Sequence, residues 1–172
     1  LKRRSGARTA LIVYAGSAHL VLPPTDDPEL LETYIQALST NLLDSPGKNA
    51  LAATEEALRL LAAEKSPGTL VLISDGADTS QLDALSKTLR ASGEDLQVLV
   101  LAVGSQSGGL ITDSNGAPRL DSSGKPIISE FDKQALEQLA DAVDAPIGSL
   151  TQNEDDLDWI QLHAQQHFRA AN

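Results

Sequence analysis

The chain has 172 residues, of which 41% are hydrophobic and 3% aromatic, so we expect one domain with a core of Leu, Val, Ile and Ala. Its 24 acidic and 13 basic residues give a net charge of −11. This charge excludes nucleic-acid binding by phosphate neutralisation and direct contact with an anionic membrane, and it favours a basic partner or a divalent cation. The chain has no cysteine, no apolar run of the about 18 residues that span a membrane and no visible signal peptide, so an anchor would have to lie outside this chain.

The N-terminal part predicts the end of a helix followed by a β-hairpin. Residues 1–4 hold the cations that suit a helix C-terminus. Thr9–Ala15 and Ala18–Leu22 are apolar segments separated by Gly16-Ser17, the pattern of two strands joined by a two-residue turn. We interpret His19 on the second strand as a surface residue rather than a ligand.

Two helices are predicted next. Asp27 suits an N-cap and Pro28 the first helical position, and an apolar stripe follows at Leu31, Tyr34, Ile35, Leu38 and Leu42. After a loop over 44–49, Asn49 can cap a second helix that ends at Ser66-Pro67-Gly68. Its inner face is predicted to hold Leu51, Leu58, Leu61 and Ala62.

The next segment organises the chain. Thr69–Ser74 is a continuous apolar run that stops at Asp75-Gly76, which is typical of a buried parallel strand. Asp75 would then lie at the carboxyl end of that strand, the edge at which open α/β sheets bind ligands. From spacing alone Asp75 is equally well explained as the cap of a turn.

Helix and strand alternate beyond this point. A helix with Leu82, Leu85 and Leu89 ends near Gly93, and Leu96–Val103 is a further apolar strand. This alternation predicts an α/β fold with a doubly wound, mainly parallel sheet flanked by helices.

Residues 104–130 break the alternation and predict a small β-hairpin excursion. The segment is rich in glycine and contains two Asp-Ser-x-Gly turns, at Asp113 and Asp121. Neither turn supplies the alternating acidic ligands and the final Glu of a calcium loop, so we interpret both as solvated turns. We expect no internal repeat.

The C-terminal part predicts helix, strand and helix. A helix is expected over 133–143, a short strand over 145–150 and a final helix opened by Asp155-Asp156. Trp159 and His163 are an i, i+4 pair on that helix. We interpret His163 and His167 as surface residues.

Catalytic motifs are missing. Gly104-Ser105-Gln106-Ser107-Gly108 places Gln106 where a nucleophile elbow needs serine, and no helix is expected directly after it. A phosphate-binding P-loop and the dinucleotide-binding G-x-G-x-x-G are also absent. The sequence therefore favours a binding module over an enzyme.

Three blocks carry a family resemblance. They are ALIVYAGSAHLVLPPTDD (Ala10–Asp27), LVLISDGADT (Leu70–Thr79) and the long glycine-rich block Leu99–Asp132. Together they resemble the von Willebrand factor A (VWA) domain of membrane-anchored bacterial proteins of aerotolerance (Bat-type) operons. The resemblance covers nearly the whole chain and implies one VWA-like domain over 1–172, with the excursion at 104–130 as an insertion.

The resemblance also implies a site. Many VWA domains hold Mg²⁺ at the carboxyl edge of the sheet with a D-x-S-x-S motif, a Thr and an Asp, and a partner's carboxylate completes the coordination. Asp75 falls on the Asp position. Lys48 falls on the Thr position, and an ammonium repels a metal ion instead of binding it. The D-x-S-x-S motif would precede Leu1, so we expect a chain truncated within its first helix, with no cofactor of its own although Mg²⁺ is possible in the intact protein.

The strand that would carry this motif lies between Thr9–Ala15 and Thr69–Ser74 in the VWA order. Without it these two strands must pair directly, stay open, or accept a strand from another chain. Open central edges favour strand exchange. We therefore predict non-standard pairing or a strand-exchanged homo-oligomer.

The function predicted on these grounds is a non-catalytic protein-interaction module of a bacterial inner-membrane protein, with this domain in the periplasm. The partner is an unidentified protein; nucleic acid and direct membrane contact are not expected. The alternatives are a metal-assisted enzyme site around Asp75, Asp78 and Asp44, and a purely structural domain. No residue is predicted to be catalytic, Asp75 is the one candidate metal ligand, and the predicted partner-binding edge comprises Ser74, Asp75, Gly76, Asp78, Lys48 and Asn49.

Overall fold

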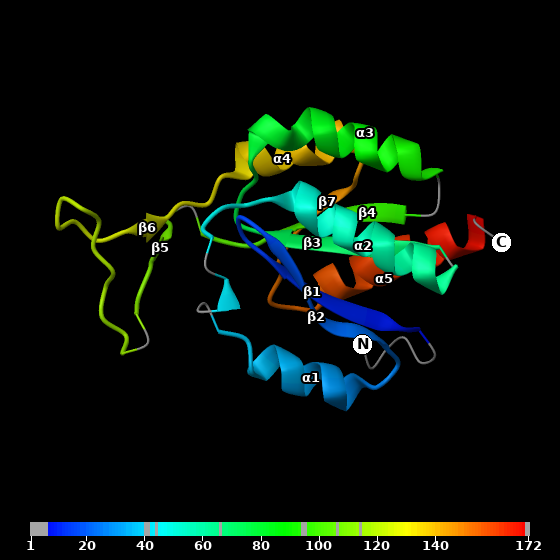
Figure 1. Cartoon of the computed structure of the whole chain (residues 1–172), viewed down its shortest axis with the longest axis horizontal. Coiled ribbons are helices and arrows are strands. Elements are labelled where there is room, and N and C mark those ends of the chain that lie inside the picture. The colour runs from blue at the N-terminus through cyan, green and yellow to red at the C-terminus, as the bar shows by residue number, and fades with distance from the viewer. Residues whose placement is uncertain are drawn as a thin grey trace.

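The structure is a computed structural model that describes residues 7–39, 42–43, 45–65, 67–93, 96–105, 107–113 and 115–170. Its centre is a parallel sheet of three strands in the order β3-β4-β7 (Figure 1). The strands are β3 (Gly68–Ser74), β4 (Leu96–Ala102) and β7 (Ile147–Ser149). The two continuous apolar runs are therefore parallel neighbours, as the sequence predicts.

Four helices cover this sheet. They are α2 (Ala50–Glu64), α3 (Leu82–Ser92), α4 (Lys133–Ala142) and α5 (Asp155–Ala170), and the short 3₁₀ helix η2 (Thr79–Gln81) precedes α3. In Figure 1, α3 and α4 lie above the sheet and α5 lies below it. This arrangement confirms the predicted α/β class with helices on both faces.

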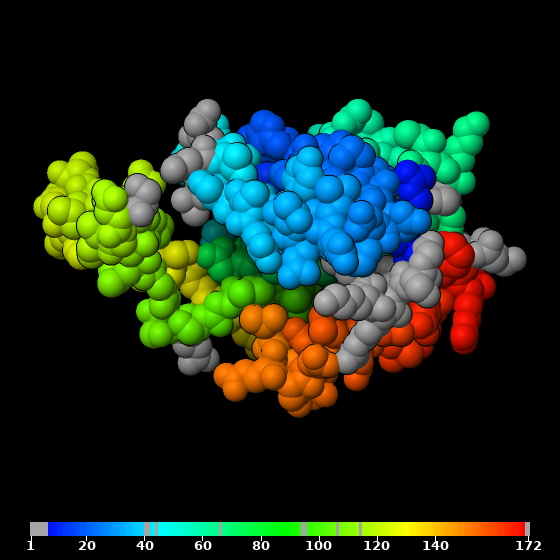
Figure 2. Space-filling view, turned by 90° about the horizontal axis from the view of Figure 1, so that it is seen from below, coloured from blue at the N-terminus to red at the C-terminus, as the bar shows by residue number. Residues whose placement is uncertain are grey.

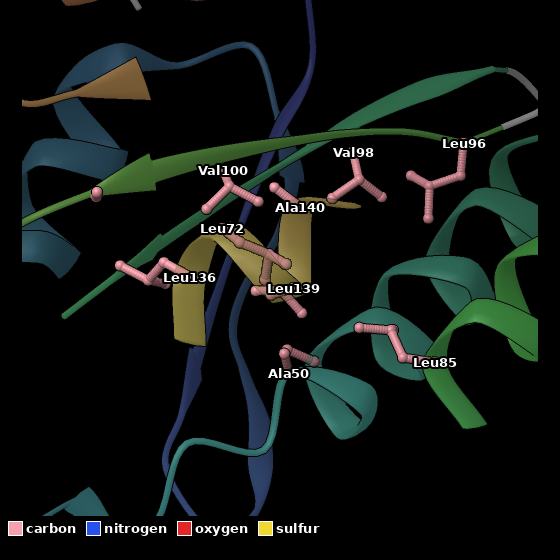
Figure 3. Close-up of a cluster of buried hydrophobic side chains, with 11 residues drawn as sticks. Ala50, Leu72, Leu85, Leu96, Val98, Val100, Leu136, Leu139 and Ala140 are labelled. Carbon is pink, nitrogen blue, oxygen red and sulfur yellow. The ribbon is translucent and has the colours of Figure 1, made fainter. Parts of the chain in front are cut away.

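The core lies between the sheet and α2, α3 and α4 (Figure 3). Alternate residues of β4, namely Val98, Val100 and Ala102, point into it beside Leu72 of β3. Leu99 and Leu101 are buried as well, although they alternate with that set, because α5 also contacts β4. In α2 the buried positions are small residues, whereas Ala62 is exposed, contrary to expectation.

The N-terminal strands form a second sheet. β1 (Thr9–Tyr14) and β2 (Ala18–Thr25) pair antiparallel, as predicted, and α1 (Pro28–Gln36) packs on β2. β2 continues through Pro23 and Pro24, beyond the predicted end at Leu22. The pairing tolerates the prolines because β2 is an edge strand and the register shifts between Thr9 and Leu11.

Helix α1 is shorter than its apolar stripe predicts. It ends at Gln36, so Leu38 and Leu42 lie outside it. Asp27 caps its first turn, accepting hydrogen bonds from the backbone N–H groups of Glu29 and Leu30, as expected. Leu31 is buried whereas Tyr34 is exposed, so the predicted inner stripe is realised only in part.

The two sheets do not join in the described part of the chain. β1 pairs only with β2 and β3 pairs only with β4, while α2 contacts β1, β2 and β3. Of the three arrangements predicted for β1 and β3, direct pairing is not present in the described residues, and strand exchange stays a prediction. The predicted doubly wound sheet is thus present only as the small β3-β4-β7 sheet beside separate antiparallel hairpins.

The predicted excursion is present and projects from the body (Figures 1 and 2). Its base is the antiparallel pair β5 (Gly109–Leu110) and β6 (Ile128–Ser129). Beyond the base, three backbone hydrogen bonds form a closed triangle, because Ile111 donates to Ile127, Ile127 to Arg119 and Arg119 to Ile111, at distances of 2.8–3.0 Å.

This triangle reflects a repeat in the sequence. Asp113 and Asp121 are eight positions apart, as are Gly116 and Gly124, Pro118 and Pro126, and the members of the triangle. Each Asp side chain accepts hydrogen bonds from the backbone N–H groups two and four residues later. The expectation of no internal repeat was therefore wrong, because this segment repeats with a period of eight residues.

Candidate functional site

The candidate site is a hollow at the carboxyl ends of the strands. It has a volume of about 480 Å³ and is lined by Tyr14, Gly47, Lys48, Ile73, Ser74, Asp75, Val103 and Ser129. These residues come from β1, the loop before α2, the end of β3, the segment after β4 and the excursion. Segments far apart in the sequence thus meet at the edge that the sequence predicts.

Asp75 is held by two side chains. The Nζ atom of Lys48 forms an ion pair with its Oδ1 atom at 2.9 Å, and the Oγ atom of Ser129 donates a hydrogen bond to its Oδ2 atom at 2.6 Å. Burial raises the pKa of Asp75, but the hydrogen bonds from Ser129 and Lys48 and the charge of Lys48 outweigh burial and lower it overall. Asp75 is therefore an anchored carboxylate and more than a turn cap.

Lys48 lies across Gly76. A Cβ atom at Gly76 would stand 2.5 Å from the Nζ atom of Lys48 and 3.3 Å from the Cβ atom of Asp132. The absence of a side chain at Gly76 thus leaves the space through which Lys48 reaches Asp75. Gly76 belongs to the predicted edge, but its role is to give Lys48 room.

Tyr14 brings the end of β1 to the same hollow. Burial raises the pKa of its hydroxyl, a side-chain hydrogen bond with Ser74 lowers it, and the charge of Asp75 raises it further. Ser74 in turn donates a hydrogen bond of 2.7 Å to the carbonyl oxygen of Gly76. The ends of β1 and β3 therefore line the same hollow although their backbones do not pair.

The side chains of Asn49 and Asp78 make hydrogen bonds that stabilise the local backbone. The Asn49 side chain caps α2 at Ala52 and donates to the carbonyl oxygen of Gly16, which ties the loop before α2 to the β1–β2 turn. The Oδ1 atom of Asp78 accepts hydrogen bonds from the backbone and the hydroxyl of Ser80 and caps η2. Asp44 lies outside the described residues.

The residues present do not fit a divalent metal ion. Both carboxylate oxygens of Asp75 are engaged, and the group beside Oδ1 is an ammonium, which has no lone pair to donate. Among the described residues, no three His, Cys, Asp or Glu side chains are grouped as metal ligands. A magnesium ion would have to displace Lys48 to reach Asp75.

Ser129 was not predicted as a site residue. It lies 54 residues after Asp75, at the end of β6, and the backbone N–H of Asp132 also donates to the carbonyl oxygen of Asp75 at 2.8 Å. Asp132 then caps α4 through Ala135. The stem of the excursion is thus bonded to the site, and no motif signals this contact because Ser129 is an ordinary residue on a two-residue strand.

Comparison with solved structures finds the same fold. The crystal structure of the conserved hypothetical protein BatB from Bacteroides thetaiotaomicron has a TM-score of 0.75 and 20% sequence identity, over 93% of this chain and 78% of that one. An aerotolerance-related membrane protein from Bacteroides fragilis NCTC 9343, solved with multiple mutations to serines, has a TM-score of 0.79 and 23% identity, over 98% of this chain and 82% of that one.

This chain has the fold of Bat-type aerotolerance proteins. The resemblance inferred from the three sequence blocks is therefore confirmed in three dimensions. No protein-family profile and no curated protein matches the sequence. Within the described residues, no helix is both long and apolar enough to cross a membrane.

Proposed function

We propose that this chain is a non-catalytic protein-interaction module with a VWA-type fold, which binds a partner protein at the hollow around Lys48 and Asp75. The observation that carries the proposal is the hollow itself, where side chains from five separate segments meet at the carboxyl edge of the sheet. Open α/β sheets bind ligands at this edge. The fold shared with Bat-type proteins gives the proposal its family context.

The bonding of the carboxylates favours binding over catalysis. A general base or a metal ligand needs an available oxygen, whereas Asp75 is bonded to Lys48 and Ser129, and Asp78 caps η2. These contacts of Asp75 and Asp78 therefore favour a binding module over the alternative of a metal-assisted enzyme, whose third residue, Asp44, lies outside the described residues.

We further propose that the domain lies in the periplasm as part of an inner-membrane protein. The support is that one structural neighbour is described as an aerotolerance-related membrane protein. Cysteine substitution of the exposed residue Lys87, followed by labelling of intact cells with a membrane-impermeant maleimide, tests this location. Labelling only after cell lysis would contradict it.

The open edges of β1 and β3 support a second mode of association, the exchange of strands between two copies. Light scattering of this chain after size-exclusion chromatography tests this mode. A concentration-dependent dimer is expected. A monomer at every concentration up to about the millimolar range would contradict exchange, because weak dimers form at such concentrations.

Site-specific photo-crosslinking in the intact protein, in membranes of its own bacterium, tests the proposed function. The crosslinker replaces Ser105, an exposed residue just after β4, and in a matched control it replaces Lys87, which is exposed on α3. A discrete adduct from position 105 and none from position 87 is expected. Equal adducts from both positions, or none from either, would contradict a partner-binding edge and favour a structural spacer.

A further inference from the structure

Lys48 occupies the place where a ligand-binding sheet edge would hold a metal ion. Its ammonium lies 2.9 Å from the Oδ1 atom of Asp75, in a hollow that opens to solvent, and its side chain is 34% exposed. The contact depends on the missing side chain of Gly76, because a Cβ atom there would collide with Nζ. The chain thus provides its own cation, covalently attached and positioned at the carboxylate.

The ammonium has hydrogen-bonding capacity that Asp75 does not use. A lysine carries three N–H donors and no acceptor. Among the described residues, Asp75 is the one acceptor that contacts the Lys48 ammonium. Asp75 itself already accepts hydrogen bonds from Lys48 and Ser129. The hydrogen-bonding groups that remain unused in this pair are therefore mainly the N–H donors of the positively charged Lys48. The ligand that matches them is an anion.

We infer that the hollow is a metal-independent receptor for a carboxylate of the partner protein, and that Lys48 is the group that binds it. This inference rests on the proposed function and specifies its ligand. The ammonium supplies the positive charge that a metal ion supplies in other ligand-binding sites. Because its donors point in different directions, Lys48 binds Asp75 and the incoming carboxylate at the same time.

The surroundings restrict the partner further. Ile73 and Val103 form apolar walls of the hollow, and Ile73 is more than half exposed. The net charge of −11 repels a run of acidic residues. The ligand that fits is a single carboxylate next to an apolar residue, from an Asp or Glu side chain or a chain terminus.

The test uses acetate as the probe. Sodium acetate is titrated into the ¹⁵N-labelled chain in the presence of EDTA, against sodium chloride at equal ionic strength. Saturable shifts are expected for the amides of Ser74, Gly76 and Ser129. In Lys48→Gln the affinity should fall by about ten-fold, the usual effect of losing one charge-assisted hydrogen bond. The control Lys87→Gln makes the same charge change on α3 and should leave the affinity unchanged.

Asp75→Asn separates this inference from a metal-centred site. Without the negative charge of Asp75, acetate is no longer repelled by a neighbouring carboxylate, so its affinity for Lys48 should rise. A metal-centred site predicts the opposite, because it loses its ligand. Unchanged binding in Lys48→Gln, weaker binding in Asp75→Asn, or shifts that require Mg²⁺ would overturn the inference.

The crosslinking experiment keeps the two proposals distinguishable. An adduct at position 105 that persists in Lys48→Gln, with no acetate binding by the chain, refutes the role of Lys48 and leaves the interaction module intact. Acetate binding without any adduct refutes the interaction module. If both proposals hold, the adduct is lost in Lys48→Gln and retained in Lys87→Gln and in the presence of EDTA.

Discussion

Strands β3 and β4 are parallel neighbours with similar apolar sequences, yet their surroundings differ. Ile73 of β3 pairs in register with Leu101 of β4, and the exposed fractions of these two residues are 57% and 4%. β4 lies between β3 and β7, whereas β3 has a strand partner on one side only in the described part of the chain. The core thus surrounds the covered strand β4, whereas the candidate site lies at the carboxyl end of the less covered strand β3.

The difference shows that an apolar run predicts a strand but not how completely that strand is covered. The covered side contains Leu99, Val100 and Leu136, which are fully buried. The carboxyl end of β3 contains polar groups from several segments around Asp75, which line the hollow. Four predictions test this contrast.

The largest effect is expected from truncating a buried residue of β4, with an exposed residue of β3 for comparison. Leu99→Ala should lower the free energy of unfolding by about 2–5 kcal/mol because Leu99 is 0% exposed. Ile73→Ala removes a side chain that is mostly in solvent and should cost less than about 1 kcal/mol. Urea unfolding measures both variants. Similar losses would show that β3 is covered as completely as β4.

A second pair of variants compares two glycines at the site. A Cβ atom at Gly16 would lie 2.7 Å from the backbone oxygen of Pro46, so Gly16→Ala should cost about 1–3 kcal/mol. At Gly76 the obstacle is the flexible end of Lys48, so Gly76→Ala should cost less than about 1 kcal/mol but break the ion pair. Unfolding curves and the shifts of the Asp75 side chain report these outcomes; an intact ion pair in Gly76→Ala would contradict the assignment.

The third prediction concerns pH. The pKa of Asp75 is lowered in the folded chain, so its contribution to stability is complete above the unfolded pKa of about 3.9 and is lost as the pH falls through the folded pKa. At neutral pH, Asp75→Asn should cost less than about 1 kcal/mol, since the ion pair is partly exposed to solvent. The difference from the parent chain should shrink at pH 3; a difference that grows would reverse the assigned direction.

The smallest global effect is expected in the excursion. Asp121→Ala removes the acceptor for the backbone N–H groups of Ser123 and Lys125. Protection of the amides of Arg119 and Ile127 against hydrogen exchange should fall, while the unfolding midpoint of the body stays within the error of the measurement. A lower midpoint would show that the excursion supports the sheet.

Local patterns predicted those features that depend on neighbouring residues. The run ending at Asp75 placed this carboxylate at a sheet edge, and Asp27 and Asn49 cap α1 and α2 as expected. The length of α1 was overestimated because Leu38 and Leu42 continue the helical spacing after the helix has ended. The spacing of apolar residues shows where a helix could bury one face, but it does not show at which residue the helix ends.

Long-range contacts were predicted less well. The closeness of Lys48 to Asp75 was implied by the family resemblance, whereas Ser129 and Tyr14 carry no motif and reach the hollow only through the fold. The triangle in the excursion could have been found, since its eight-residue spacing is visible in the sequence. The separation of β1 from β3 depends on which strands have partners, and a single strand's sequence does not encode this.

Calorimetric titration of the chain with MgCl₂ tests the central claim most directly. Because the ammonium of Lys48 occupies the position beside Asp75, the account predicts no saturable heat of magnesium binding. Asp75→Ala serves as the control for binding elsewhere on this acidic chain. Tight magnesium binding by the parent chain that disappears in Asp75→Ala would contradict the account.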